Sequence, residues 1–446
     1  MTKAQTILLS GAPRRIGEAY GGLVAPELGG RVRRMWQQAK ASGIGRVGLE
    51  ERAETFRGYV ERIAPEWLDE VEGIAWAAHI EPMDLLVLNA LPPGFWTHRS
   101  DECTSCIVAG TASATGDTLL HKNRDLVDTT QEFHVRRVPG DIQVLASREI
   151  GELGFAHFHS DVALAGGNNT GSHIAPDELR DCGLNCCQLL RLLAERASSC
   201  DEAVAVLEEA VAKEVAGGSG GHRGMIFLFA EPNSGMVVEM TSRRLACREV
   251  HNEIAVRANH FVLPEMLPYA AEEPNDNTRL RYERARELLH AGPDVNVADL
   301  ARFSRDHAHG PDSICTADAK HAWMTVSACS HVVRGENADP RAHTRAAIGN
   351  TRNALYIPIP RAIDGLPAEC TTGELHNLSR ALYAAHGVGD HLAAAQEEHE
   401  RAMAAEFVSV AAAARFGPAK GLSAQLTKFV ARCVSRVRNV LEDFIT

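Results

Sequence analysis

The chain has 446 residues, of which 45% are hydrophobic, so it can bury a substantial core in one large domain or in two to three smaller ones. Acidic residues outnumber basic residues by 58 to 46, and the net charge of −12 repels phosphate backbones, which argues against a nucleic-acid partner. No stretch approaches the roughly 20 apolar residues of a membrane-spanning helix, and the N-terminus lacks the apolar segment of a signal peptide. Eleven cysteines without a compact repeat are typical of free thiols. We therefore predict a cytoplasmic protein without a membrane partner.

The predicted elements begin with helices. Residues 13–92 carry apolar side chains at intervals of three and four, and the pattern ends at "PPG". After Ser100 come two short apolar segments, "CTSCIVAG" and "DTLLHKNRD", separated by a small, glycine-bearing stretch. This arrangement predicts a β-hairpin. Two further strands are predicted in "EFHVRRV" and "IQVLAS".

Helices and strands alternate in the rest of the chain. Residues 182–215 predict a helix pair, and four β segments follow at the spacing of a meander. Residues 277–292 and the alanine-rich last 80 or so residues are predicted to be helical. "GGSGG" at 217–221 lacks the G-K-S/T of a phosphate-binding loop, so it indicates a flexible loop. The order of elements predicts sheets covered by helices on their outer faces.

Two cysteines, Cys103 and Cys106, stand in a C-x-x-C spacing in the first hairpin strand. A structural zinc site needs a second ligand pair at comparable spacing, and neither the other cysteines nor the His-x-His pairs at His157 and His307 supply one, so no metal is predicted. A redox pair would open a helix, whereas strand and turn follow here. The third interpretation takes Cys103 alone as a nucleophile, because antiparallel pairing brings Asp125 close to it. Cys106 faces the other side of the strand and is predicted to pack.

The segment "CTSCIVAGTASATGDTLLHKNRD" resembles the start of the N-terminal-nucleophile cysteine hydrolases, in particular the penicillin (isopenicillin N) acyltransferase-like family, which is related to choloylglycine hydrolases and to cysteine dipeptidases. Further motifs follow in the expected order: "GGNNTG", "GMIFLFAEPNSGMVVEMTS", "AVRANHFVLPEM" and "NTRLRYERARELL". The resemblance covers roughly residues 5–360. It implies an α+β fold, a four-layer αββα sandwich. We expect a helical propeptide at 1–102, the core at 103–360 and a helical C-terminal extension at 361–446.

The resemblance also implies a precursor that is cut between Glu102 and Cys103, which frees an α-amino group on the nucleophile. An α-amine with a pKa near roughly 8 can act as the base for its own thiol, so no catalytic histidine is needed. Cys103 would attack an amide carbonyl and form a thioester. Asp125 is implied to orient the Cys103 amine, and Asn259 to donate to the oxyanion, a contact worth about 3 kcal/mol in comparable sites. Glu102 departs from the family, in which glycine is common at this position.

The fourth catalytic residue that the resemblance implies is an arginine. Arg281 fits the S-x-x-R-x-x-R pattern if Thr278 stands for the serine. Arg279 and Arg284 compete for this role, and a solvated helix face is the alternative for all three. The sequence therefore leaves the choice of arginine open.

Four residues are candidates for substrate binding. Lys122 occupies the place of an arginine in bile-salt-hydrolase-like relatives and would favour the thiolate, with a solvated lysine as the alternative. Asn168 matches a pocket asparagine, although Asn169 can claim the same position and both can be turn formers. His222 and Arg223 stand where relatives often carry a small hydroxyl residue, and they are expected to contact the substrate instead.

We expect an autoproteolytically processed cysteine amidohydrolase that cleaves a C–N amide bond of a small N-acyl or peptide-like substrate. An acyltransferase is the close alternative, and the dipeptidase-like tail favours hydrolysis. An unprocessed, non-catalytic homologue with a binding role is a further alternative, motivated by Glu102. The expected partners are a small-molecule amide substrate and the two chains of one precursor. No cofactor is implied, and the oligomeric state, homo-oligomer included, stays open.

Overall fold

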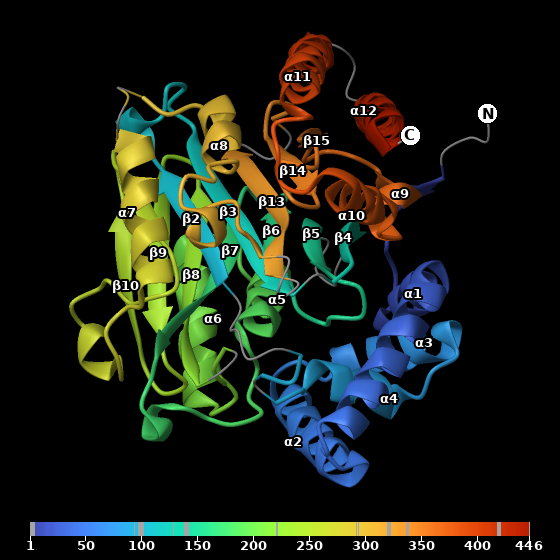
Figure 1. The fold of residues 1–446 in the computed structure, drawn as a ribbon, viewed down its shortest axis with the longest axis vertical. Helices are drawn as coiled ribbons and strands as arrows, with labels where there is room; N and C mark the ends of the chain where they lie inside the picture. Colours follow the sequence, from blue (N-terminus) through green and yellow to red (C-terminus); the bar gives the residue numbers. More distant parts are fainter. Residues whose placement is uncertain are drawn as a thin grey trace.

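Two antiparallel sheets lie face to face in the computed structural model, and helices pack around them (Figure 1). No helix in the described ranges is long and apolar enough to cross a membrane. The structure describes residues 5–92, 94–96, 102–127, 129–137, 142–219, 222–290, 292, 294–318, 323–335, 339–416 and 421–445.

The first sheet is a continuous antiparallel ribbon with the strand order β10-β9-β8-β7-β6-β5-β4. Its β4 and β5 confirm the two strands that were predicted after the hairpin. Its strands are β4 (Gln131–Arg137), β5 (Gln143–Glu149), β6 (His157–Ser160), β7 (Ala165–His173), β8 (Arg223–Glu231), β9 (Ser234–Met240) and β10 (Leu245–Val250).

The second sheet has the strand order β11-β2-β3-β13-β14-β15, with β12 beside β13. The predicted hairpin is confirmed as β2 and β3, which place Cys103 opposite Arg124. Its strands are β2 (Glu102–Val108), β3 (Thr118–Val127), β11 (Ile254–Arg257), β12 (Ala317–Asp318), β13 (Trp323–Val333), β14 (His343–Ile348) and β15 (Ile357–Pro360).

The predicted four-strand meander is wrong in its last member. Three strands, β8 to β10, form the meander, but β11 leaves the first sheet and pairs with β2 of the second. Without β11, β2 would be an edge strand with unpaired backbone groups, and the pairing of Val256 with Cys106 covers that edge. Because β11 crosses over, the segment that follows it lies beside the start of β2.

Helices cover the outer face of each sheet. Leucines of α5 (Cys186–Arg196) and α6 (Cys200–Ala212) share an apolar core with Phe227 and Phe229 of β8. Residues of α7 (Asp276–His290) and α8 (Val297–Phe303) pack instead on the second sheet. The order helix, sheet, sheet, helix confirms the predicted αββα sandwich.

The predicted helical layer over residues 13–92 is confirmed. Two of its helices, α1 and α3, approach closely at glycines, because a Cβ on Gly17 or Gly73 would lie 2.2 or 2.1 Å from the backbone oxygen of the other helix. The four helices lie together (blue in Figure 1) and are α1 (Pro13–Ala41), α2 (Arg46–Ile63), α3 (Glu66–Ala78) and α4 (Pro82–Asn89).

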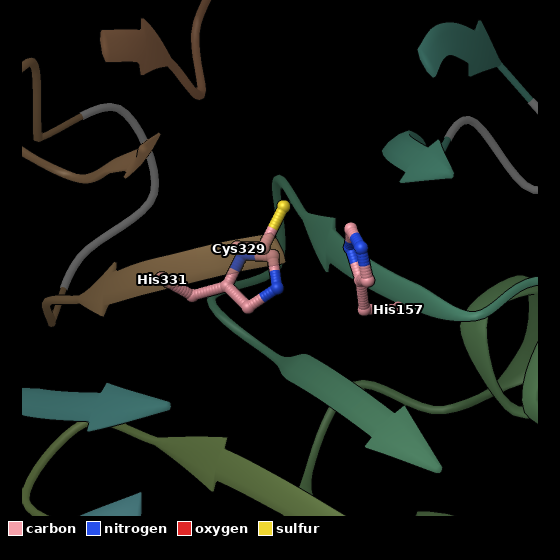
Figure 2. Close-up of side chains that lie close together, drawn as sticks. All are labelled: His157, Cys329 and His331. Carbon is pink, nitrogen blue, oxygen red and sulfur yellow. The ribbon is translucent and has the colours of Figure 1, made fainter. Parts of the chain in front are cut away.

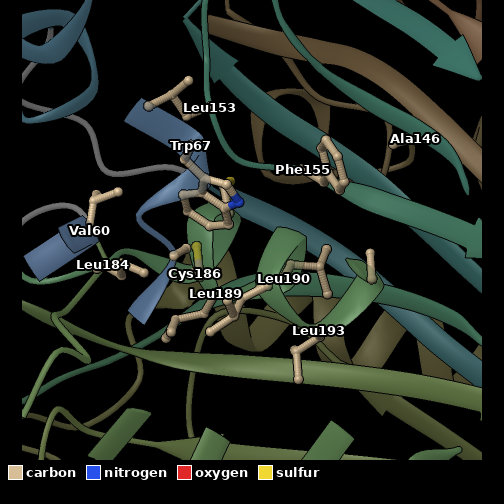
Figure 3. Close-up of a cluster of buried hydrophobic side chains, with 14 of the residues drawn as sticks. Val60, Trp67, Ala146, Leu153, Phe155, Leu184, Cys186, Leu189, Leu190 and Leu193 are labelled. Atoms are coloured by element: carbon tan, nitrogen blue, oxygen red, sulfur yellow. The ribbon is translucent and has the colours of Figure 1, made fainter. Parts of the chain in front are cut away.

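The N-terminal helices are joined to the rest of the molecule by one continuous apolar core. Trp67 of α3 and Val60 of α2 lie in the same cluster as Leu189 and Leu193 of α5 (Figure 3). A buried carboxylate adds polar contacts, since Glu70 of α3 accepts from the guanidinium of Arg136 at 2.8 Å. The layer is therefore an integral part of the core.

The C-terminal helices pack against β14 and β15 through a second apolar cluster. The predicted helical character of this region is confirmed, whereas the division of the chain at 102 and 360 stays a prediction. The remaining elements are α9 (Ala368–Thr371), α10 (Glu374–His386), α11 (Ala393–Phe416), α12 (Leu422–Ile445), the strand pair β1 (Thr6–Ile7) and β16 (Leu366–Pro367), and short 3₁₀ turns at Gly110–Ala112, Pro176–Glu178, Leu267–Tyr269 and Gly310–Asp312.

Candidate active site

Cys103 lies near the start of β2 and is 4% exposed. Successive residues of a strand point to opposite faces, so Cys103 shares its face with Ser105, whose hydroxyl donates to Asn169 of the first sheet at 2.7 Å. The nucleophile candidate therefore points between the two sheets. Cys106 points the other way and packs in the apolar cluster beneath α7 and α8, as predicted.

Two side chains hold the backbone of Cys103. Its N–H donates to the Asn259 Oδ1 atom at 2.9 Å, and its carbonyl oxygen accepts from Arg281 Nη1 at 2.6 Å. Arg281 Nη2 donates to the same Asn259 oxygen at 2.8 Å. The Asn259 Nδ2 atom donates to the carbonyl oxygen of Thr170 at 2.8 Å, so the partners fix which way the amide faces. The structure thus brings together three of the four predicted catalytic residues at the backbone of Cys103.

Arg281 is the arginine of α7 that enters the site, and its side chain is fully buried. Its guanidinium lies 3.7 Å from the Glu102 carboxylate and 4.0 Å from that of Asp125. Arg279 pairs instead with acidic residues on the helix surface, and Arg284 pairs with Asp306 at 2.8 Å. Among the three competing arginines, only Arg281 contacts Cys103 in the described structure.

Asp125, the fourth predicted catalytic residue, lies opposite Glu102 in the hairpin ladder. Burial raises the pKa of its carboxyl to about 7, although the Arg281 charge and a 2.6 Å hydrogen bond from the Thr325 hydroxyl lower it, and the Glu102 charge raises it further. A carboxyl with a pKa near neutrality can both accept and release a proton at physiological pH.

Lys122 lies fully buried beside the nucleophile. Burial raises the pKa of the Cys103 thiol, and the Lys122 ammonium partly offsets this rise. The same ammonium donates to Asn168 Oδ1 at 3.2 Å, and the Asn168 amide donates to the carbonyl oxygen of Phe155 at 2.9 Å. Lys122 is thus a buried cation and not a solvated one, and Asn168 lies in strand β7 and not in a turn.

A cavity of about 750 Å³ opens over Glu102. His222 is exposed at its wall, whereas the Arg223 guanidinium donates to the carbonyl oxygen of Asn259 at 2.7 Å. Both predicted contact residues therefore reach the cavity, while Lys122 and Asn168 lie outside its lining. The N-terminal helices and the segment after them supply much of the wall, including Arg31, Phe56, Leu91 and Trp96.

The sequence interpretation missed Thr325, a polar partner of Asp125. It lies on β13, a strand that was not predicted, and it reaches Asp125 only because β13 pairs with β3. No local pattern links the two residues. Thr278, which was considered only as the stand-in for a serine, accepts from the backbone N–H of Asn259 at 2.8 Å.

A family model and several solved structures match this chain. The family model described as "Acyl-coenzyme A:6-aminopenicillanic acid acyl-transferase" matches residues 169–330 and confirms the predicted resemblance. No curated protein matches the chain. Among solved structures, the Caenorhabditis elegans ortholog of N-acylethanolamine-hydrolyzing acid amidase is 13% identical over 52% of this chain and 92% of its own, with a TM-score of 0.37. Conjugated bile acid hydrolase from Clostridium perfringens is 11% identical over 55% and 92%, with a TM-score of 0.34.

Proposed function

We propose that this chain, an enzyme of the N-terminal-nucleophile cysteine hydrolase and acyltransferase class, cuts its own Glu102–Cys103 bond and then hydrolyses a small amide through a thioester on Cys103. The observation that carries the proposal is that Asn259 accepts from the Cys103 N–H, at the bond to be cut, while Arg281 donates to the Cys103 carbonyl oxygen and lies 4.0 Å from the Asp125 carboxylate. Buried charges are costly, so the concentration of Arg281, Asp125 and Glu102 around Cys103 favours a chemical role there.

In the self-cleavage step, the Cys103 sulfur attacks the carbonyl carbon of Glu102, and the thiol proton passes to the Asp125 carboxylate. The pKa of about 7 allows Asp125 to return that proton to the Cys103 nitrogen as the C–N bond breaks. Water then hydrolyses the Glu102 thioester, leaving a carboxylate on Glu102 and a free amine and thiol on Cys103. The hydrogen bond from Arg281 to the Cys103 carbonyl oxygen holds the backbone of the nucleophile in place throughout.

The mature enzyme would use the new amine as its base. The thiol proton passes to the Cys103 amine, the sulfur attacks the substrate amide, and the amine side of the substrate leaves with that proton. The Lys122 ammonium stabilises the thiolate, because it is buried beside the sulfur with little water to screen it. Water enters through the cavity above the site and releases the acyl group.

Contacts across the cut would keep the two chains together. Glu70 of the small chain is buried against Arg136 and Arg191 of the large chain, and Trp67 donates to Glu195 at 2.8 Å. The shared apolar core adds a much larger buried surface. We therefore expect one tightly associated complex of the two chains, and small-chain residues remain in the cavity wall.

Intact-mass measurement of purified protein tests the cleavage. Two species of 102 and 344 residues that divide between Glu102 and Cys103 are expected, since 446 − 102 = 344. A single 48.3 kDa species that stays unchanged during long incubation would favour the non-catalytic binding homologue. Hydrolysis is then measured with a panel of N-acylated amines and short peptides.

Acyl transfer is the second candidate, and the matching acyltransferase family model favours it. Adding a primary amine during turnover separates the two outcomes. If water resolves the thioester, the product is the free acid at every amine concentration. If an acceptor site exists, the acylated amine accumulates with a saturable dependence on the amine.

A further inference from the structure

A second polar cluster lies between the two sheets, outside the candidate active site. His157 of β6 faces Cys329 and His331 of β13 (Figure 2). Each of the three offers one ligand atom, an imidazole nitrogen or the thiol sulfur, and these atoms lie within 4.8 Å of one another. All three residues are at most 1% exposed. Three close donor atoms on buried side chains can converge on one metal ion.

We propose that His157, Cys329 and His331 bind one thiophilic metal ion, with monovalent copper as the best match. Two imidazoles and a thiolate are soft to intermediate ligands, which select copper or zinc over magnesium and calcium. Along the sequence, only His157 of these three residues stands out as a candidate ligand, because the ligands come from strands of different sheets. The earlier expectation of no metal depended on ligand spacing along the chain.

Hydroxyl groups hold both histidine rings. The Ser147 hydroxyl lies 2.7 Å from His157 Nε2, and the Thr344 hydroxyl lies 2.8 Å from His331 Nδ1. Hydrogen bonds to the outer nitrogen are the usual way in which proteins orient a metal-binding histidine. Each ring is therefore positioned with its other nitrogen available.

The Thr344 hydroxyl also constrains the tautomers. It contacts His159 Nδ1 at 3.2 Å as well as His331 Nδ1, and one hydroxyl proton can serve only one of these rings. At least one of the two rings must donate through Nδ1, so its Nε2 carries a lone pair. The Nε2 atoms of His159 and His331 are both buried without a hydrogen-bond partner among the described residues. When His331 is the ring that donates, a metal ion would satisfy the lone pair of its Nε2 atom.

The charges around the cluster favour a monovalent ion. Lys122 and Arg124 act on His157 as positive neighbours, and all three candidate ligands are at most 1% exposed. Binding replaces the Cys329 thiol proton: Cys–SH plus M⁺ gives Cys–S–M plus H⁺, with no change in buried charge. A divalent ion would add one positive charge beside Lys122.

Bound metal would join the two sheets, since β6 and β13 belong to different ones. Cys329 also lies opposite Lys122 in the ladder of β13 and β3, next to the cation that faces Cys103. The metal site does not depend on the proposed amide chemistry, because none of its three ligands is a predicted catalytic residue.

An anaerobic titration of the full-length protein with Cu(I), in competition with a chromophoric Cu(I) chelator, tests the site. We expect one tight equivalent, weakened by more than about 100-fold in Cys329→Ser and by about 10–100-fold in Thr344→Val, which removes only the supporting hydroxyl. Cys433→Ser is the matched control, because Cys433 is equally buried but lies in α12. It should bind like the parent.

Thermal unfolding separates metal binding from misfolding. Cu(I) should raise the unfolding midpoint of the parent and of Cys433→Ser, but not that of Cys329→Ser or His157→Gln. Equal Cu(I) affinity in the parent and Cys329→Ser would overturn the site. Tighter binding of Zn(II) than of Cu(I) would overturn the assignment of a monovalent ion. If Cys329→Ser does not fold, His157→Gln provides the same comparison.

Discussion

The two ends of the β2–β3 hairpin are equally buried but chemically opposite. At one end Cys103, Arg124 and Asp125 lie among Asn259 and Arg281. At the other end four apolar residues, Ile107, Val108, Leu119 and Leu120, enter the hydrophobic clusters on either face of the sheet. The same backbone ladder supports both. Burial of ionised groups opposes folding, so the charged residues of the polar end indicate a chemical role. The residues of the apolar end stabilise the fold.

The largest expected effect comes from replacing each cysteine of the hairpin separately by alanine. Cys103→Ala should abolish both self-cleavage and amide hydrolysis, because it removes the only attacking atom of the proposal. Cys106→Ala, three residues away on the apolar side, should cleave at the parental rate. The intact mass after purification shows whether each variant has cut itself, and the panel of amides measures hydrolysis. Equal loss in the two variants would restore the paired-cysteine interpretations.

The next effect concerns the guanidinium at the polar end. Arg281→Ala leaves the Asp125 carboxylate buried beside Glu102 without its neighbouring cation, and removing one partner of such a group costs about 3–5 kcal/mol. We expect a large fall in the free energy of unfolding together with lost cleavage. Arg279→Ala, an exposed change on the same helix, is the control. Chemical denaturation compares the two, and similar losses would show that Arg281 has no special role.

Asp125 should make the uncut chain sensitive to pH. Its folded pKa of about 7 lies above the ordinary 3.8, so the folded state binds the proton more tightly and loses stability as the pH rises between these values. In the uncut Cys103→Ala background, Asp125→Asn removes this pH dependence. The free energy of unfolding of the double variant, relative to that of Cys103→Ala, should therefore grow by roughly 3 kcal/mol from pH 5 to pH 8. Urea unfolding at the two pH values measures it, and a pH-independent difference would contradict the assignment.

The apolar end should respond in stability alone. Ile107→Val deletes one buried methyl group, which costs about 1 kcal/mol, and leaves the polar end untouched. Self-cleavage should proceed at the parental rate. Denaturant unfolding in the uncut background and a cleavage time course in the active one provide the two readouts. A clear change in cleavage rate would mean that the two ends are coupled through the hairpin.

The sequence predicted the hairpin and the helical layers because each has a local signature, a glycine-bearing turn or an apolar period of three to four. It did not predict β13, in which polar residues such as Thr325, Ser327 and Ser330 are buried together with the apolar ones. Thr325 and the metal-ligand candidates Cys329 and His331 were missed with it. The helical periodicity, by contrast, would have distinguished Arg281 from Arg279 and Arg284. Ala285 and Leu289 follow Arg281 at intervals of four, so all three lie on the buried face of the helix.

The smallest expected effect tests Glu102, which stands where the family that the chain resembles commonly has glycine. Glu102 lies opposite Asp125, and its charge is one of the causes of the raised pKa there. Glu102→Gly should therefore lower that pKa and move the pH profile of self-cleavage downward by less than about one pH unit. At pH 6, where more Asp125 would be ionised, cleavage should be roughly threefold faster, equivalent to about 0.7 kcal/mol.

Glu102→Gln separates charge from bulk in the same experiment. It removes the charge and keeps the side chain, so it should shift the pH profile as Glu102→Gly does. Time courses on denaturing gels from pH 5 to pH 9 supply the rates. A profile that moves for glycine and not for glutamine would assign the effect to access of the sulfur to the carbonyl carbon. In that case the carboxylate pair at the polar end would not control the cut.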